Sequence, residues 1–371
     1  MTNKKKYIGE VEESKAGNSA LKVNQGIEQP PQVNPSFRKY KRVKRILTIS
    51  DYVNGILAGN VNVLSQAITL VESRLPEHQD LAQQIIEKCL SLGKKSVRLG
   101  ITGVPGVGKS TFIEALGMEV VNKGHKLAVL AVDPSSERSG GSILGDKTRM
   151  EELSVQKNAF IRPSPSAGSL GGVARKTRES IVLCEAAGYD TIFIETVGVG
   201  QSETAVHSMV DFFLLLMLSG AGDELQGIKR GIMEMADAIA ITKADGNNVQ
   251  KAKLAQAQYQ NALHLFPQTE SKWTPIVLTC SSLEKTGIGE IWETIKNYET
   301  HARENGFFEK NRLRQSKYWL FEALNAALKE RFYDDSLVKT ELKKLEIEIE
   351  NDKISSFVAA SKLLDIYFKK K

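Results

Sequence analysis

One nine-residue run limits what this chain can fold into more than any other part of its sequence. It begins at residue 103, reads GVPGVGKST and fits the pattern G-x-x-x-x-G-K-[ST]. An apolar stretch, Val97 to Thr102, precedes it and is expected to form a buried strand, and a helix is expected over Lys109 to Asn122. A strand, this loop and a helix in that order predict a P-loop. Its residues are Gly103, Val104, Pro105, Gly106, Val107, Gly108, Lys109, Ser110 and Thr111.

Each kind of residue in this loop has a physical role in holding phosphate. The glycines let the backbone wrap around phosphate oxygens with its N–H groups pointing inward. The start of the helix adds the positive end of its dipole. We expect Lys109 to place its charge at the β- and γ-phosphates and Ser110 to offer its hydroxyl to Mg²⁺, which prefers oxygen ligands. The run therefore predicts a site for a magnesium-bound nucleotide.

A second element is needed to hold the metal and to sense the γ-phosphate. The expected strand Thr191 to Ile194 is followed by Glu195-Thr-Val-Gly198, where GTPases commonly carry D-x-x-G. We expect the Glu195 carboxylate to reach the Mg²⁺ shell or the attacking water, and the Gly198 N–H to bond the γ-phosphate. Asp133 and Asp146 are further candidate metal ligands, with a helix cap or a loop-bracing carboxylate as the alternative for each.

A third motif predicts which base is bound. Thr242-Lys243-Ala244-Asp245 follows an expected strand, where guanine-specific GTPases carry N-K-x-D. An Asp carboxylate accepts hydrogen bonds from N1–H and the 2-amino group of guanine, and adenine offers neither. We expect Asp245 to select guanine and the Lys243 stem to cover the base, whereas Thr242 in place of Asn should weaken the bracing of the loop. A last loop, whose backbone is expected to contact guanine O6, contains Ser281, Ser282 and Leu283.

The rest of the central sequence alternates expected strands with expected helices. Such alternation predicts an α/β fold of the P-loop NTPase type, with a mostly parallel sheet and helices on both faces. Beyond the strand before the P-loop, strands are expected at 127–132, 191–194, 212–218, 238–242 and 276–279. We divide the chain into a disordered polar tail (1–36), an N-terminal helical segment (37–94), the P-loop domain (95–300) and a C-terminal helical extension (301–371).

The C-terminal extension contains a short heptad-like pattern. Apolar residues recur there at spacings of four, three and four, at Val338, Leu342, Leu345 and Ile349. Such a short seam suits packing within the chain, and it also suits a dimerisation arm. Both interpretations stay open from the sequence.

The amino-acid composition limits the cellular location and the classes of partner that we expect. The chain has 50 Lys/Arg and 44 Asp/Glu, hence a net charge of +6, but eleven basic and four acidic residues in the first 45 place +7 there. The remaining residues sum to −1, which disfavours a nucleic-acid partner. No run approaches the ~20 apolar residues of a membrane-spanning helix, and the three cysteines lack the spacing of a disulfide scaffold. We expect a cytoplasmic protein with no membrane partner.

Taken together, these motifs resemble the MeaB/MMAA family of P-loop GTPases, whose members are also called ArgK. The resemblance extends from about Asp51 to Phe332. Besides the P-loop, its specific runs are 132–136, 140–150, 162–165, 195–203 and 222–229. It implies a homodimeric, Mg²⁺-dependent GTPase that binds GTP and GDP. It also implies a chaperone of an adenosylcobalamin-dependent acyl-CoA mutase, usually methylmalonyl-CoA mutase, that gates cofactor loading and protects the mutase, with the cobalamin held only by the partner.

The resemblance further implies roles for single residues. Asp133 and Asp146 match the family's first switch, and Glu195 matches the second. The stretch 220–231 resembles an additional switch loop. Lys229 in that loop is expected to act as an internal counterpart of an arginine finger, with a solvated loop lysine as the alternative.

Two other functions stay open at this point. A kinase would pass the γ-phosphate to a protein or a small molecule, as the name ArgK suggests. A pure interaction module would hold its nucleotide without turnover. The sequence also leaves the partner mutase open, because isobutyryl- and ethylmalonyl-type mutases fit the resemblance too.

Overall fold

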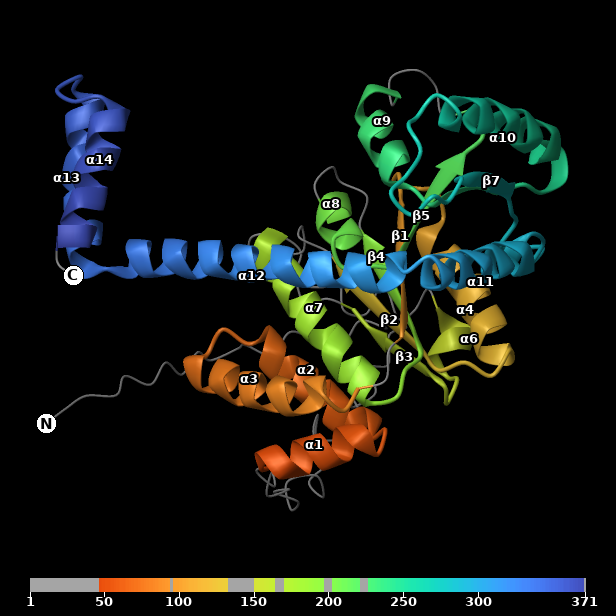
Figure 1. Cartoon of the computed structure of the whole chain (residues 1–371), viewed down its shortest axis with the longest axis horizontal. Helices are drawn as coiled ribbons and strands as arrows, with labels where there is room; N and C mark the ends of the chain where they lie inside the picture. The colour runs from red at the N-terminus through yellow and green to blue at the C-terminus, as the bar shows by residue number, and fades with distance from the viewer. Residues whose placement is uncertain are drawn as a thin grey trace, which may run out of the picture. The chain divides into compact units, whose positions relative to one another are not determined.

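The computed structural model describes residues 47–93, 96–132, 150–163, 170–196, 202–220 and 226–369. The polar tail expected at 1–36 lies outside these residues. Within the described part, a central β-sheet is covered by helices on both faces, and further helices stand at either end of the chain (Figure 1). The predicted α/β fold with helical extensions is therefore confirmed.

The sheet of the described residues has seven parallel strands in the order β3-β2-β4-β1-β5-β6-β7. The chain crosses from one side of β1 to the other between β4 and β5. Ligands of open parallel sheets bind beyond the carboxyl ends of the strands at such a crossing point. The strands are β1 (Val97–Gly103), β2 (Leu127–Val132), β3 (Ala159–Arg162), β4 (Thr191–Thr196), β5 (Phe212–Leu218), β6 (Ala238–Thr242) and β7 (Ile276–Thr279).

Six of these strands coincide with the strands expected from the sequence, and β3 was missed. β3 has only four residues and lies at the edge of the sheet, paired with β2. It ends in Arg162, whose guanidinium pairs with Glu72 instead of entering the core. A short edge strand with this composition has no apolar run that would reveal it.

Side chains of successive strand residues alternate between two apolar cores. Ile192 and Ile194 of β4 face one core, and Phe193 between them faces the other. The helices α4 (Lys109–Asn122), α6 (Glu151–Ser154) and α11 (Ile288–Glu304) contribute to the core around Phe193 or lie against it. The opposite face is covered by α7 (Leu170–Ala186), α8 (Ser202–His207), α9 (Gln226–Met235) and α10 (Val249–Leu263).

The N-terminal helical segment forms three helices that pack on α7. They are α1 (Ile49–Leu57), α2 (Val61–Glu72) and α3 (Pro76–Leu90). Thr48 and Asp51 form a capping box at the start of α1, and the Asn60 side chain caps α2. These local signals explain why the segment breaks into three helices.

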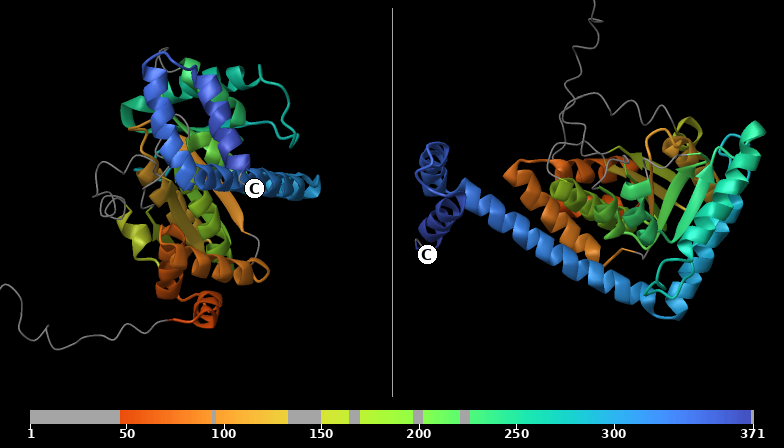
Figure 2. Two further views of the ribbon diagram at one scale, coloured as in Figure 1. Left: turned by 90° about the vertical axis from the view of Figure 1, so that its left-hand side faces the viewer. Right: turned by 90° about the horizontal axis from the view of Figure 1, so that it is seen from above.

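The C-terminal extension consists of α12 (Phe307–Asp334), α13 (Ser336–Glu350) and α14 (Ser356–Lys369). Figure 2 shows α12 leaving the sheet with α13 and α14 at its far end. α11 continues past residue 300, so the extension begins inside the last turn of that helix. Val338 and Leu345 of the heptad-like seam are buried against Ala359 and Leu363 of α14, so part of the seam packs within this hairpin.

No helix in the described part of the chain is both long and apolar enough to cross a membrane.

Candidate nucleotide-binding site

The P-loop lies between the end of β1 and the start of α4, at the crossing point of the sheet. Gly108 precedes α4 with a φ of +92°, a left-handed conformation that glycine adopts without strain. A Cβ on Gly103 would lie 2.7 Å from the Leu216 carbonyl oxygen of β5, so the backbone leaves no room for a side chain there. The glycines therefore permit both the turn and the close contact with β5.

Lys109 turns its ammonium back onto the loop that precedes it. Its Nζ donates to the carbonyl oxygens of Gly103 at 2.8 Å and Val104 at 3.3 Å. Burial lowers the pKa of Lys109, and the nearby Glu195 and Glu203 carboxylates oppose that shift. The loop thus holds a half-buried ammonium group, which can bind phosphate oxygens through charge-assisted hydrogen bonds.

Glu195 reaches this site from the neighbouring strand. Its backbone pairs in register with Ile101 of β1 and Ala131 of β2, near the carboxyl ends of those strands. The next residue, Thr196, donates its hydroxyl to that of Thr102 at 2.8 Å, and both threonines are buried. This bond fixes the end of β4 against the end of β1, so the positions of Glu195 and the P-loop are linked.

Glu203 lies in the first turn of α8, and the sequence analysis did not assign it to the site. Its side chain is 4% exposed, and its Oε2 has no hydrogen-bond partner within the described ranges. Its charge acts on Lys109. An acidic residue in the first turn of a helix normally indicates interaction with the helix dipole. Only its position in the run that begins at Glu195 could have linked it to the phosphate site.

Thr242 braces the P-loop. Its hydroxyl donates to the Val107 carbonyl oxygen at 2.8 Å, and the side chain is 2% exposed. The sequence predicts weaker bracing from threonine than from asparagine; the structure shows that Thr242 does contact the loop, through its hydroxyl. Lys243 adds a second contact, since its Nζ donates to the Gly106 carbonyl oxygen at 2.9 Å.

Asp245 is held by the last loop. Ser281 Oγ donates to Asp245 Oδ2 at 2.6 Å, and the Ala244 N–H donates to the Cys280 carbonyl oxygen at 3.0 Å. Gly287 closes this loop: a Cβ there would lie 2.2 Å from the Thr279 carbonyl oxygen. The carboxylate of Asp245 is therefore oriented before any ligand arrives, as base recognition requires.

The structure brings together most of the predicted site residues that it describes. Backbone or side-chain contacts join the P-loop, Lys243, Asp245 and Ser281 into one cluster, and Leu283 beside it is 79% exposed. Ser282 follows Ser281 in the same loop. Lys229 lies on α9, of which only the backbone is described at that position. The predicted residues outside the described ranges are Asp133, Asp146 and Gly198.

The residues present fit a magnesium ion that is completed by phosphate. Ser110 and Glu195 supply a hydroxyl and a carboxylate, the hard oxygen donors that Mg²⁺ accepts. The described residues hold no group of three or more His, Cys, Asp or Glu side chains that could bind a metal by themselves. Mg²⁺ commonly takes one or two protein ligands together with phosphate oxygens and water, so this donor set suits a nucleotide-bound ion.

Comparison with known proteins places these features in a family. The sequence model of the family described as "Methylmalonyl Co-A mutase-associated GTPase MeaB" matches residues 64–336. The GTPase ArgK of Escherichia coli is 50% identical over 273 residues, which cover 74% of this chain and 82% of that protein. The mitochondrial methylmalonic aciduria type A homolog of Mus musculus is 45% identical over 323 residues, covering 84% and 78%. A solved structure, the LAO/AO transport system kinase, superposes with a TM-score of 0.69 at 36% identity, covering 87% and 99%.

Proposed function

Since this chain belongs to the MeaB family of GTPases, we propose that its P-loop cluster binds magnesium GTP and hydrolyses it to GDP and phosphate. The observation that carries this site assignment is the pair of bonds between the base motif and the phosphate loop, from Thr242 to Val107 and from Lys243 to Gly106. These bonds hold the base motif against the phosphate loop, as binding the base and the phosphates of one nucleotide requires.

In this proposal Lys109 is the main catalytic cation. Its ammonium leaves the carbonyl oxygens of Gly103 and Val104 and moves to the β- and γ-phosphates. Ser110 and Glu195 hold Mg²⁺, and Glu195 also positions the attacking water. The residues proposed to complete the site are Asp133 and Asp146 at the metal, Gly198 at the γ-phosphate and Lys229 at the charge that develops during phosphoryl transfer.

Base selection is assigned to Asp245. Ser281 already occupies one lone pair of its Oδ2, and the remaining lone pairs can accept the N1–H and 2-amino groups of guanine. Adenine would leave these remaining lone pairs without a donor from the base, which disfavours its binding relative to guanine. The aliphatic part of Lys243, which spans toward the P-loop, is proposed to cover the base.

The biological role that we propose is that of a chaperone for an adenosylcobalamin-dependent acyl-CoA mutase, with methylmalonyl-CoA mutase as the first candidate. The support is the family description, which names methylmalonyl-CoA mutase. The GTPase would gate loading of the mutase with its cofactor and protect it from inactivation. Adenosylcobalamin would then be bound by the mutase and not by this chain.

We further propose that the chain works as a homodimer joined through α12. From Leu320 onward this helix carries large apolar side chains that are exposed in the single chain: Leu320, Phe321, Leu324 and Leu328. Burying them against the same helix of a second copy would remove this apolar surface from water, the main driving force for stable association.

Hydrolysis of GTP labelled in the γ-phosphate, with and without purified methylmalonyl-CoA mutase, tests the proposed role. We expect label to appear as inorganic phosphate, faster when the mutase is present, and the two proteins to co-elute in size-exclusion chromatography. Label on a protein or small-molecule acceptor would indicate a kinase instead. Absence of turnover with every adenosylcobalamin-dependent mutase tried would indicate that the nucleotide is structural.

A further inference from the structure

The first half of α12 is fastened to a short segment of the core, residues 208–211, which joins α8 to β5. Gln315 Nε2 donates to the Val210 carbonyl oxygen at 2.7 Å, and Trp319 Nε1 donates to the Ser208 carbonyl oxygen at 3.1 Å. Gln315 is 5% exposed and Trp319 is 9% exposed. Two buried side chains of one helix thus supply the hydrogen bonds that this segment's carbonyls need.

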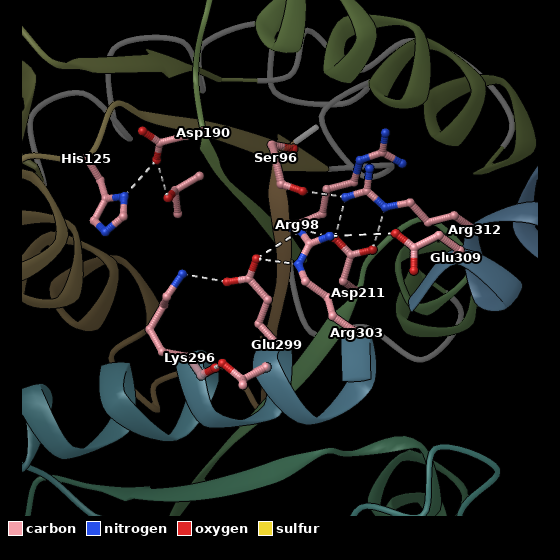
Figure 3. Close-up of polar contacts among 12 residues, drawn as sticks. Ser96, Arg98, His125, Asp190, Asp211, Lys296, Glu299, Arg303, Glu309 and Arg312 are labelled. Carbon is pink, nitrogen blue, oxygen red and sulfur yellow. Dashed lines mark hydrogen bonds and ion pairs between the residues drawn. The ribbon is translucent and has the colours of Figure 1, made fainter. Parts of the chain in front are cut away.

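An ionic contact extends the same attachment to β1. Arg312 donates to both carboxylate oxygens of Asp211, at 2.8 and 2.6 Å, and also to the Ser96 carbonyl oxygen (Figure 3). Asp211 in turn accepts the Arg98 N–H of β1 at 2.8 Å. β1 is the strand that ends in the P-loop, and Ser96 and Arg98 lie at its start, so α12 is tied to the amino end of that strand.

The segment 208–211 directly continues α8. The Ser208 N–H donates to the Thr204 carbonyl oxygen at 3.1 Å, and the Met209 N–H donates to that of Val206 at 2.9 Å. Val206 and Met209 are fully buried, so α8 and the segment after it are held as one packed piece. A movement of α8 therefore carries the carbonyl groups that hold α12.

The other end of α8 acts on the phosphate site. Glu203 lies five residues before Ser208, and the charge of its buried carboxylate acts to raise the pKa of Lys109. One Glu203 oxygen has no hydrogen-bond partner within the part of the chain that the structure describes. Phosphate at Lys109 changes the charge opposite a buried carboxylate, whose energy depends strongly on its charged neighbours. We therefore expect nucleotide binding to alter the forces on α8.

We propose that Gln315 and Trp319 are positioning residues that couple the phosphate site to the orientation of α12. The coupling rests on the proposed binding of nucleotide at Lys109. It is carried from Lys109 through Glu203 and α8 to the carbonyl oxygens of Ser208 and Val210. Because coupling between two sites is reciprocal, anything that moves α12 also changes the affinity for the nucleotide.

Helix length makes the coupling measurable. The stretch of α12 between Trp319 and Asp334 extends about 22 Å, so a tilt of about 10° at Trp319 displaces Asp334 by about 4 Å. The α13–α14 hairpin follows directly after Asp334. A small adjustment at the phosphate site is therefore expected to become a shift of several Å at the end of the arm.

Double electron–electron resonance between spin labels at Lys253→Cys on α10 and Lys329→Cys on α12 measures this shift. Both positions are exposed, and the native Cys89, Cys184 and Cys280 are buried. Labelled chains are diluted with unlabelled ones so that only distances within a chain are recorded. We expect the distance distribution to differ between the GDP state and the state with a non-hydrolysable GTP analogue and magnesium.

Two variants remove the hydrogen bonds while keeping similar side-chain volume: Gln315→Met and Trp319→Phe. In the double variant the nucleotide-dependent distance change should be lost. The ratio of the double variant's affinities for the GTP analogue and for GDP, measured with fluorescent nucleotides, should differ from that of the unmodified chain by about fivefold or more. Lys317→Gln, at an exposed position between them, is the matched control and should behave as the unmodified chain.

The coupling is overturned if the unmodified chain binds both nucleotides with the same distance distribution, or if the double variant keeps both the distance change and the affinity ratio. Far-ultraviolet circular dichroism of the variants identifies any loss of folding, in which case the single variants are used. If the unmodified chain binds neither nucleotide in the fluorescence titration, the proposed function itself is wrong and the coupling falls with it.

Discussion

Three side chains from two motifs converge on a few backbone carbonyls of the P-loop. Lys109 donates to Gly103, Lys243 donates to Gly106, and the Thr242 hydroxyl donates to Val107. These contacts engage three of the loop's carbonyl oxygens, the groups that would repel a phosphate. At the scale of single residues, the site is a set of donors and acceptors arranged for an anion.

The hydroxyl of Thr242 gives the first prediction. Thr242→Val keeps the shape of the side chain but leaves the buried Val107 carbonyl oxygen without this partner, which should lower the free energy of unfolding by about 1–3 kcal/mol. GTP affinity should fall as well, because the loop loses a brace. Urea denaturation and fluorescent-nucleotide titration measure the two effects, and unchanged values for both would show that the bond does not support the loop.

Lys109→Ala gives the second prediction. Removing the ammonium takes away the charge proposed to stabilise the transferring phosphoryl group, so hydrolysis of GTP should fall below detection. Phosphate release is the measurement. Lys126→Ala, which removes an exposed lysine at the opposite end of the sheet, is the control and should retain the rate. Turnover that survives Lys109→Ala would place the reaction elsewhere.

Single residues were predictable where a motif fixes both the residue type and its place on a strand end. Lys109, Lys243 and Asp245 are of this kind: Lys109 follows the carboxyl end of β1, and Lys243 and Asp245 follow that of β6, two strands that are separated only by β5. Glu203 was not predictable by itself, because no spacing rule connects it to Lys109. Ser281 was expected to act through its backbone, yet its hydroxyl holds Asp245, a contact that depends on how two loops meet.

At the scale of elements, a buried acid joins strands β5 and β6 to α11. The carboxylate of Asp237, just before β6, accepts the Phe213 N–H at 2.8 Å, and its backbone carbonyl accepts from Trp273 Nε1 at 3.0 Å. Burial raises the pKa of Asp237 to about 7, against the opposing effects of the Phe213 N–H and a side-chain hydrogen bond with Tyr298. This acid lies at the end of the sheet opposite the P-loop.

The raised pKa gives a pH-dependent prediction for Asp237→Asn. The folded chain binds the Asp237 proton more tightly than the unfolded chain does, so this residue makes stability fall as pH rises from about 4 to about 7, with no further change above. Asn mimics the protonated acid and should remove that decline. Urea denaturation at pH 5 and pH 8 should therefore show a smaller loss in the variant than in the unmodified chain.

Asp80→Asn, at an exposed position on α3, controls for the loss of one carboxylate and should leave the pH profile as it was. Parallel profiles for the unmodified chain and the Asp237 variant would show that the Asp237 carboxylate is ionised in the folded protein across this range.

A helix or strand was predictable from the sequence where its apolar periodicity and the residues that mark its ends indicated the same bounds. α4 begins and ends where expected, because the P-loop fixes its start. α12 lies inside the helical extension expected at 301–371, but its bounds were not predictable, since its first half, with Arg312 and Gln315, is attached to the core by polar contacts that carry no apolar pattern. Tertiary contacts, and not local preference, set its length.

At the scale of the whole molecule, the family resemblance inferred from the motifs is confirmed by the match over residues 64–336. The long runs that carry the resemblance made this possible without any structure. The assembly was not predictable in the same way. The heptad-like seam of α13 could serve either within the chain or between chains, and the structure places Val338 and Leu345 within the chain while the apolar surface of α12 stays exposed.

The proposed homodimer gives the fourth prediction. Leu324→Lys combined with Leu328→Lys places two charges on the exposed surface of α12, and burying them in an interface would be strongly unfavourable. Multi-angle light scattering should show a dimer for the unmodified chain and a monomer for this variant. Leu254→Lys, at another exposed leucine on α10, should remain dimeric. A variant that still dimerises would place the interface elsewhere.

The most direct test of the central claim is a crystal structure of the chain with a non-hydrolysable GTP analogue and magnesium. We predict that the triphosphate lies along the backbone N–H groups of residues 103–108, with Lys109 Nζ moved from the Gly103 and Val104 carbonyl oxygens to the β- and γ-phosphates. The guanine should lie against Asp245. Nucleotide bound at any other place, with Lys109 still on those carbonyl oxygens, would contradict the account.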